Sequence, residues 1–162
     1  MSVRKLRLKG RHTWKCKPGY LVCVIDRGRV RFDFPSRWIV EPGPGAVLLH
    51  DQPPSVESCD LGVSIFRVPN AQVRELPLDE PLRGTPGDDR VPYQQTGIRH
   101  SARGDLEIAW LEQRYLDTGS NRDARFRVAL ARGQVICLIS MNYRSSRAAL
   151  LEPVWDECSD NS

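Results

Sequence analysis

The spacing of apolar residues predicts strands in the first third of the chain. Residues 30–34 are apolar at every second position, with Arg31 and Asp33 between them. This two-residue period is typical of a strand that is half buried against a core. Two further apolar runs, residues 38–40 and 46–49, follow and are separated by a turn rich in proline and glycine. Together the three segments predict a small antiparallel meander.

The flanking segments predict two more strands. Residues 20–25 are continuously apolar and rich in β-branched side chains, which indicates a central strand covered on both faces. A tight turn at residues 26–29 follows, in which Gly28 can adopt positive φ. Residues 52–60 carry two prolines and several polar side chains and therefore predict a loop. Residues 61–68 resume as a strand.

The middle of the chain predicts little regular structure. Asn70 is a good N-cap, so we expect a short helix from there to about Leu76. Residues 77–104 contain many prolines and glycines and predict the longest irregular segment. Long loops in compact domains are often functional, so this segment is a candidate partner surface.

The last third predicts a second meander and a helix. Residues 105–117 fit a strand or a helix, and the strand is favoured because residues 126–130 alternate with polar positions such as Arg127. Gly133-Gln134 then predicts a two-residue type II′ hairpin into residues 135–143. A terminal helix should begin near Ser145 or Ser146, and Pro153 should break or restart it.

Length and composition predict one ordinary domain. The chain has 162 residues, of which 40% are hydrophobic and 27% are charged. We assign residues 1–19 to a basic N-terminal arm or edge strand, residues 20–158 to a single domain and residues 159–162 to a tail. Every apolar run is far shorter than the roughly 20 residues that cross a bilayer. No signal-peptide h-region follows the basic start, so the cytoplasm is the expected compartment.

The net charge of +4 changes this picture only at the N-terminus. Seven of the first seventeen residues are lysine or arginine, and Trp14 is the aromatic residue among them. A nucleic-acid module usually interleaves several exposed aromatic residues with its basic ones or carries a known motif. The pattern therefore favours a solvated arm and argues against nucleic-acid binding.

The cysteines predict reduced structural thiols. There are five, an odd number, and no two have the spacing of a metal-binding motif. A redox or metal site would require Cys16 and Cys23 to face each other or a histidine. We therefore expect all five cysteines to be free.

The sequence contains no established catalytic, cofactor or metal motif. The three histidines lie far apart, and Ser64 and Ser140 lack a nucleophile-elbow motif. The adjacent carboxylates Asp88 and Asp89 have no recognisable partner acid. His50-Asp51 could form a metal site or an acid–base pair with Asp60 if the intervening loop folds back. We predict no catalytic, cofactor or metal residues.

One short motif is similar to a known family. Residues 32–38 read Phe-Asp-Phe-Pro-Ser-Arg-Trp, which resembles the aromatic-x-aromatic-Pro-x-x-Trp signature of Mog1/PsbP-like domains, including bacterial DUF1795 proteins. Later strand segments and a closing Pro-Val-Trp agree in order and spacing. The structural residues of this resemblance are Phe32, Phe34, Pro35, Trp38, Trp110 and Trp155. It implies an α+β fold, an α/β/α sandwich around a central, mostly antiparallel sheet.

The resemblance also implies a binding role. Family members include a Ran-GTPase partner, an extrinsic photosystem subunit and chaperones for transmembrane segments of secreted effectors. The expected lack of a targeting segment argues against the photosystem role. The first hypothesis is a cytoplasmic, non-catalytic protein-binding domain, a chaperone or adaptor, with Trp14, Arg90 and Tyr93 as candidate partner contacts. Formation of a homodimer is a further alternative.

The rival hypothesis is an enzyme or small-ligand binder. It would use His50 together with the loops at residues 52–60 and 77–104. An apolar surface with a polar rim would favour the first hypothesis. A deep pocket with a convergent histidine and aspartate would favour the second.

Overall fold

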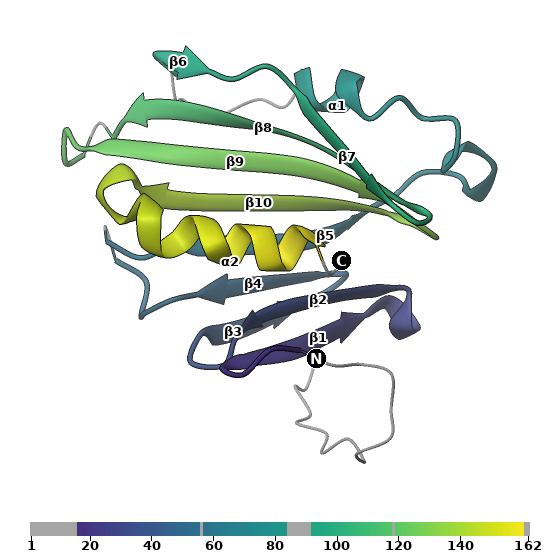
Figure 1. Cartoon of the computed structure of the whole chain (residues 1–162), viewed down its shortest axis with the longest axis horizontal. Coiled ribbons are helices and arrows are strands. Elements are labelled where there is room, and N and C mark those ends of the chain that lie inside the picture. Colours follow the sequence, from purple (N-terminus) through teal and green to yellow (C-terminus); the bar gives the residue numbers. More distant parts are fainter. Residues whose placement is uncertain (1–15, 56, 84–91, 118, 161–162) are drawn as a thin grey trace.

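The computed structural model describes residues 16–55, 57–83, 92–117 and 119–160 (Figure 1). Its strands are β1 (Tyr20–Ile25), β2 (Val30–Pro35), β3 (Ile39–Gly43), β4 (Ala46–His50), β5 (Asp60–Phe66), β6 (Gln94–Gln95), β7 (Arg99–Arg103), β8 (Leu106–Leu116), β9 (Asp123–Arg132) and β10 (Ile136–Arg144). Its α-helices are α1 (Asp79–Arg83) and α2 (Ala148–Asp160), and 3₁₀ turns occur at Asp26–Gly28, Asn70–Gln72 and Ser145–Arg147. Neither α-helix of the described segments has the length and apolar character needed to cross a membrane.

The strands form one large sheet and one separate hairpin. The order in the large sheet is β3-β4-β5-β10-β9-β8-β6, and β7 also pairs with β8. Strands β1 and β2 pair only with each other among the described residues. Every pairing is antiparallel. The expected α+β class and mostly antiparallel sheet are confirmed.

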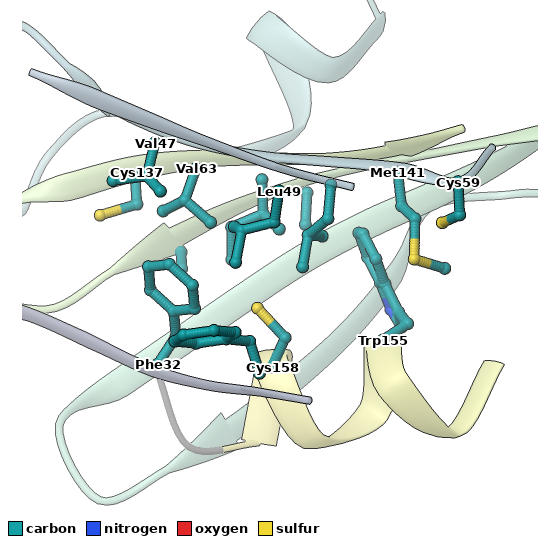
Figure 2. Packing of buried hydrophobic residues seen from close by; sticks show 14 of the residues in the cluster. Phe32, Val47, Leu49, Cys59, Val63, Cys137, Met141, Trp155 and Cys158 are labelled. Carbon is teal, nitrogen blue, oxygen red and sulfur yellow. The ribbon is translucent and has the colours of Figure 1, made fainter. Parts of the chain in front are cut away.

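The main core lies between the sheet, helix α2 and the β1–β2 hairpin. Helix α2 crosses one face of the sheet (Figure 1). Phe32 and Phe34 of β2 and Trp155 of α2 are buried against that face. Figure 2 shows Phe32 and Trp155 opposite side chains of the sheet, including Leu49 and Met141. We call this the α2 face. Its packing explains the resemblance motif, whose aromatic residues join the hairpin and the helix to the sheet.

The second core lies on the opposite face of the sheet and is smaller. Val73, Leu78 and Leu82, from the segment around α1, pack on buried side chains of strands β8, β9 and β10. Helix α1 contacts β8 and β9. We call this the α1 face. Because α1 has only one turn, it covers only part of this face.

Two predictions about the first third were wrong. β1 is a strand, but it is the outer strand of the two-stranded hairpin and is not central, and none of its residues is fully buried. β2 and β3 belong to different sheets, so residues 30–49 do not form one meander. A tight turn after Pro35 redirects the chain, because the Trp38 amide donates to the Pro35 carbonyl at 3.1 Å. Gly28 has the predicted positive φ of 88°.

The second meander was predicted correctly apart from the turn at Gly133-Gln134. β8, β9 and β10 are sequential neighbours, as expected. Arg132 pairs with Ile136, which leaves a three-residue loop, and Gly133 is not among the residues with positive φ. The type II′ prediction at that loop was therefore wrong. A two-residue turn with positive φ at its first position occurs instead at Gly104-Asp105, between β7 and β8.

The helix predictions were partly wrong. The predicted helix from Asn70 is only a 3₁₀ turn ending at Gln72. No serine side chain caps the turn that precedes α2, and α2 continues through Pro153. Pro153 is exposed, so the carbonyl that loses its usual donor, four residues earlier, lies on the solvent side of the helix.

Candidate functional site

The described residues cover only part of the α1 face of the sheet. Antiparallel partners share a face, so the register links Leu111, Val128, Ser140, Gly62 and Leu48 in one row across five strands. Leu111 and Val128 are buried under the α1 segment. At the other end of the row Leu48 is 39% exposed. The surface of β3, β4 and β5 on this face is therefore open, and we call it the open half.

A groove runs through the open half. It has a volume of about 240 Å³, and its lining includes Glu41, Leu48, Gly62, Ser64 and Ser140. Gly62 forms the hollow, because a Cβ atom there would lie 3.2 Å from Ser140 Oγ and 3.8 Å from Leu48 Cδ1. Any larger residue at this position would fill part of the groove.

The edge strand β3 carries a further exposed apolar side chain on the open half. Ile39 of β3 pairs with His50 of β4 and is 43% exposed. Ile39 and Glu41 alternate with Val40, so both lie on the face that carries Leu48. The open half thus combines two exposed aliphatic residues, a shallow hollow and a carboxylate.

His50 joins three strands at one end of the groove. Its Nδ1 lies 2.6 Å from Asp60 Oδ1 on β5, and its Nε2 lies 3.1 Å from Glu41 Oε2 on β3. The imidazole is buried, whereas both carboxylates are partly exposed. Burial lowers the pKa of His50, but the hydrogen bonds to Asp60 and Glu41 outweigh it and raise the pKa above its ordinary value. We call these three residues the His50 cluster.

The predicted His50–Asp51–Asp60 constellation forms only in part. Asp60 does meet His50, but Asp51 points elsewhere. Its Oδ1 accepts from the Cys59 amide at 2.7 Å, and its Oδ2 pairs with Arg147. Among the described residues, no group of three histidine, cysteine or acidic side chains could hold a metal ion. Both imidazole nitrogens already face carboxylates, so the cluster ties strands together.

The structure describes one of the three candidate partner contacts and shows regular elements within the predicted long loop. Trp14 and Arg90 lie outside the described residues. Tyr93 is 57% exposed, and its hydroxyl donates to Asp123. The prediction that residues 77–104 are irregular was wrong for α1, β6 and β7. Strand β7 is exposed at every position, and its residues are polar apart from Ala102, so it has no apolar alternation that a pattern could show. Its His100 side chain pairs with Asp79 at 2.6 Å, and its Arg99 guanidinium lies 4.9 Å from the centre of the Trp110 ring.

A buried ionic network on the α2 face was not predicted from the sequence. Arg127 Nε lies 2.7 Å from Glu112, and its Nη2 lies 3.1 Å from Glu152 of α2. Its guanidinium lies 4.9 Å from the centre of the Trp110 ring, and that ring lies 5.8 Å from the Trp155 ring. The alternation of residues 126–130 placed Arg127 on a polar face. That face is instead covered by α2, and Glu112 and Glu152 balance the charge.

The five cysteines are free thiols. Burial raises the pKa of Cys23 to about 11 and that of Cys137 to about 12. Burial also raises the pKa of Cys59 and Cys158 well above the ordinary range. These four side chains are therefore neutral thiols at neutral pH, which is typical of packing residues.

Two solved structures are similar to this chain, and one of them supports the fold. The chain resembles the solution structure of cyanobacterial PsbP (CyanoP) from Synechocystis sp. PCC 6803, with a TM-score of 0.51 and 17% identity over 91% of this chain and 96% of that one. The crystal structure of LpqN, involved in cell envelope biogenesis of Mycobacterium tuberculosis, matches with a TM-score of 0.46 and 14% identity over 89% and 83% of the two chains. The likeness to CyanoP shows a PsbP-like fold.

The sequence itself matches a narrower group. An uncharacterized protein, alr1449 of Nostoc sp. (strain PCC 7120 / SAG 25.82 / UTEX 2576), is 34% identical over 155 residues, covering 94% of this chain and 81% of the relative. The sequence profile of the Alr1449 family matches residues 21–161. The chain therefore belongs to the Alr1449 family, and its domain has a PsbP-like fold.

Proposed function

We propose that this domain is a non-catalytic binding module that holds a segment of another protein in the groove of the open half. The observation that carries the proposal is the exposed Leu48, which lines the hollow at Gly62, together with the exposed Ile39 on the same face of the neighbouring strand. Exposed apolar surface with a polar rim is characteristic of interaction sites. The resemblance to Mog1/PsbP-like and DUF1795 proteins suggests a chaperone or adaptor, and we propose that it acts in the cytoplasm.

The backbone of the open half restricts how a partner can bind. Strands β4 and β5 are paired on both sides. A segment lying over them cannot add to the sheet and must be recognised by side chains. The aliphatic residues offer apolar contact, and the Ser64 and Ser140 hydroxyls can bond to the partner backbone.

Charge favours a partner segment with a basic residue next to an apolar one. In the His50 cluster two carboxylates share a single imidazole, so the cluster is net negative even when His50 is protonated. Glu41 also lines the groove. A lysine or arginine of the partner could pair with Glu41 while its apolar neighbour occupies the hollow at Gly62.

The rival hypothesis assigned catalysis to His50. A general base needs a ring nitrogen within reach of the proton that it removes. Both nitrogens of His50 face carboxylates of the protein itself, and the ring is buried. This geometry favours a role in holding β3 and β5 to β4.

Site-specific photocrosslinking tests the proposal. A benzoylphenylalanine at Leu48 should crosslink a protein in cells of the source organism, whereas one at Leu150 of α2, which is 66% exposed, should not. The purified wild-type chain should capture the same protein, and Leu48→Asp should abolish this capture. Leu150→Asp is the matched control. The crosslinked peptide should contain an apolar residue beside a lysine or arginine.

Three results would overturn the proposal. One is capture that survives Leu48→Asp in a protein with unchanged thermal unfolding. Another is a crosslink to a second copy of this chain, which would make the open half a homodimer interface. The third is turnover of a small substrate that His50→Ala abolishes without unfolding the domain.

A further inference from the structure

A second, larger cavity lies at the end of the sheet where the hairpin turns gather. It has a volume of about 410 Å³ and lies between the start of β2, the β7–β8 turn and the β9–β10 turn. Figure 1 shows these turns at the same end of the molecule. We call it the end pocket. It shares no lining residue with the groove of the open half.

The floor of the end pocket is apolar and fixed. Val30 and Cys137 are buried in the main core, and Leu106 and Val135 pack against that core. Gly133 also lines the pocket, and a Cβ atom there would lie in ordinary contact with Leu106 Cδ1, at 3.9 Å. Cavities of a few hundred Å³ with an apolar floor and a few polar groups are typical of small-molecule sites.

Most charges on the rim of the end pocket are already paired. Arg29 lies 2.9 Å from Asp26. Arg132 pairs with Glu107 and donates to the Leu76 carbonyl at 2.6 Å. These arginines have local partners and need no ligand to balance them.

Two rim charges of opposite sign have no hydrogen bond or ion pair within the described part of the chain: Arg74 and Asp105. Both stand on anchored backbone. Val73, beside Arg74, is buried in the second core. Asp105 occupies the two-residue β7–β8 turn, where Gly104 has a φ of 61°. The two side chains are also not paired with each other across the pocket.

We propose that the end pocket binds a small zwitterion with an apolar side chain, that is, a free apolar α-amino acid. The Arg74 guanidinium offers a planar fork of donors that matches a carboxylate. The Asp105 carboxylate accepts from an ammonium group. The apolar floor takes the side chain, and one ligand pairs with both of these solvent-exposed charges. This proposal is independent of the partner site on the open half.

Isothermal titration with the purified full chain tests this assignment. L-phenylalanine is the probe, and 3-phenylpropionate and 2-phenylethylamine are the same molecule without the ammonium or without the carboxylate. Phenylalanine should bind saturably and more tightly than either analogue. Arg74→Ala and Asp105→Asn should each weaken phenylalanine by about tenfold, the effect of one charge-assisted contact.

The analogues make the test specific to each charge. Asp105→Asn should leave 3-phenylpropionate unweakened, and Arg74→Ala should leave 2-phenylethylamine unweakened. Gly133→Val should block all three ligands by filling the space over Leu106. Arg37→Ala is the matched control, because Arg37 is an exposed arginine outside the pocket.

Each contrary outcome has a distinct meaning. No saturable binding of phenylalanine in the millimolar range overturns the site. Equal binding of phenylalanine and one analogue overturns the zwitterion assignment. Tighter binding of a peptide ending in phenylalanine, with the same dependence on Arg74, would replace the free amino acid by a chain terminus. Thermal unfolding of every variant shows whether a lost signal reflects a lost fold.

Discussion

The two halves of the α1 face share one continuous sheet but differ in what lies over them. Across β8 and β9 the outward positions are large and apolar, such as Leu111 and Leu130, and the α1 segment buries them. Across β4 and β5 the corresponding positions include Gly62 and Ser64, and nothing in the described residues covers the groove above them. The same backbone pairing therefore supports a core in one half and an accessible surface in the other.

This difference indicates which part of the α1 face stabilises the fold and which part is accessible to a partner. Burying a leucine side chain stabilises the fold by about 2 kcal/mol, and that gain is complete only where a second layer excludes water. Leu48 and Ile39 remain in contact with solvent, so they contribute less to stability. Substitutions should therefore separate the two halves by the size of their effect on the free energy of unfolding.

The largest expected difference is between the same substitution in the two halves. Leu130→Ala removes a buried side chain under the α1 segment, and we expect it to lower the free energy of unfolding by about 2 to 5 kcal/mol. Leu48→Ala removes a partly exposed one and should cost less than about 1 kcal/mol. Urea denaturation measures both. Equal costs would show that the open half is packed as tightly as the covered half.

The next effect tests whether charge can be buried where a helix covers the sheet. Glu112→Ala leaves the buried Arg127 with Glu152 alone, and we expect a loss of about 3 kcal/mol, the lower end for stranding a buried charge. Lys17, which pairs with Glu157 at a more exposed position, is the control. Lys17→Ala should cost much less than Glu112→Ala, because solvent screens an exposed ion pair. A Glu112→Ala loss as small as this would contradict the covered network.

The strands and their inward faces could be predicted from the spacing of apolar residues. The cover that a distant helix places over a strand could not. Two-residue periodicity correctly gave β2 and its inward phenylalanines, because alternation is a property of the strand itself. It could not show that α2 would cover Arg127 and bring Glu152 to it, because those residues lie on separate elements. It placed Asp33 on a polar face, yet Asp33 is 2% exposed, and burial raises the pKa of its carboxyl.

The open half itself left a weaker signal in the sequence. His50 and Asp60 were weighed together because both flank the loop at residues 52–60. Glu41, which completes the cluster, was missed. Its place depends on the β3–β4 register, in which Glu41 pairs with Leu48, two residues before His50. A prediction of which residues pair within the β3–β4 hairpin, and not only of the strand bounds, could have placed Glu41 on the same face as His50.

A third prediction concerns pH and the His50 cluster. The folded pKa of His50 is raised, so protonation stabilises the folded state more than the unfolded one. This contribution is fully present below the ordinary histidine pKa of about 6.5 and is lost as pH rises through the folded pKa. The free energy of unfolding should therefore fall over that window in wild type.

His50→Asn and Asp60→Asn check the origin of this pH dependence. His50→Asn should remove the fall in stability, because the titrating group is gone. Asp60→Asn removes one of the two carboxylates that raise the pKa, so the fall should move to lower pH. Chemical denaturation at a series of pH values measures each curve. An identical slope in wild type and His50→Asn would show that another group titrates in this window.

The smallest expected effect on stability comes from filling the groove. Gly62 lacks positive φ, so Gly62→Ala introduces no backbone strain, and its new methyl must fit 3.2 Å from Ser140 Oγ, which can rotate away. Replacing a strand glycine gains about 0.5 to 1 kcal/mol of backbone entropy, and this gain should offset the close contact.

Gly45→Ala is the control. Gly45 has a φ of 66°, so the same change there should cost about 1 kcal/mol. Unfolding midpoints should thus be unchanged for Gly62→Ala and lowered for Gly45→Ala, whereas crosslinking through Leu48 should weaken only for Gly62→Ala. A Gly62→Ala protein that is as stable as wild type and captures its partner undiminished would place the contact elsewhere than the hollow.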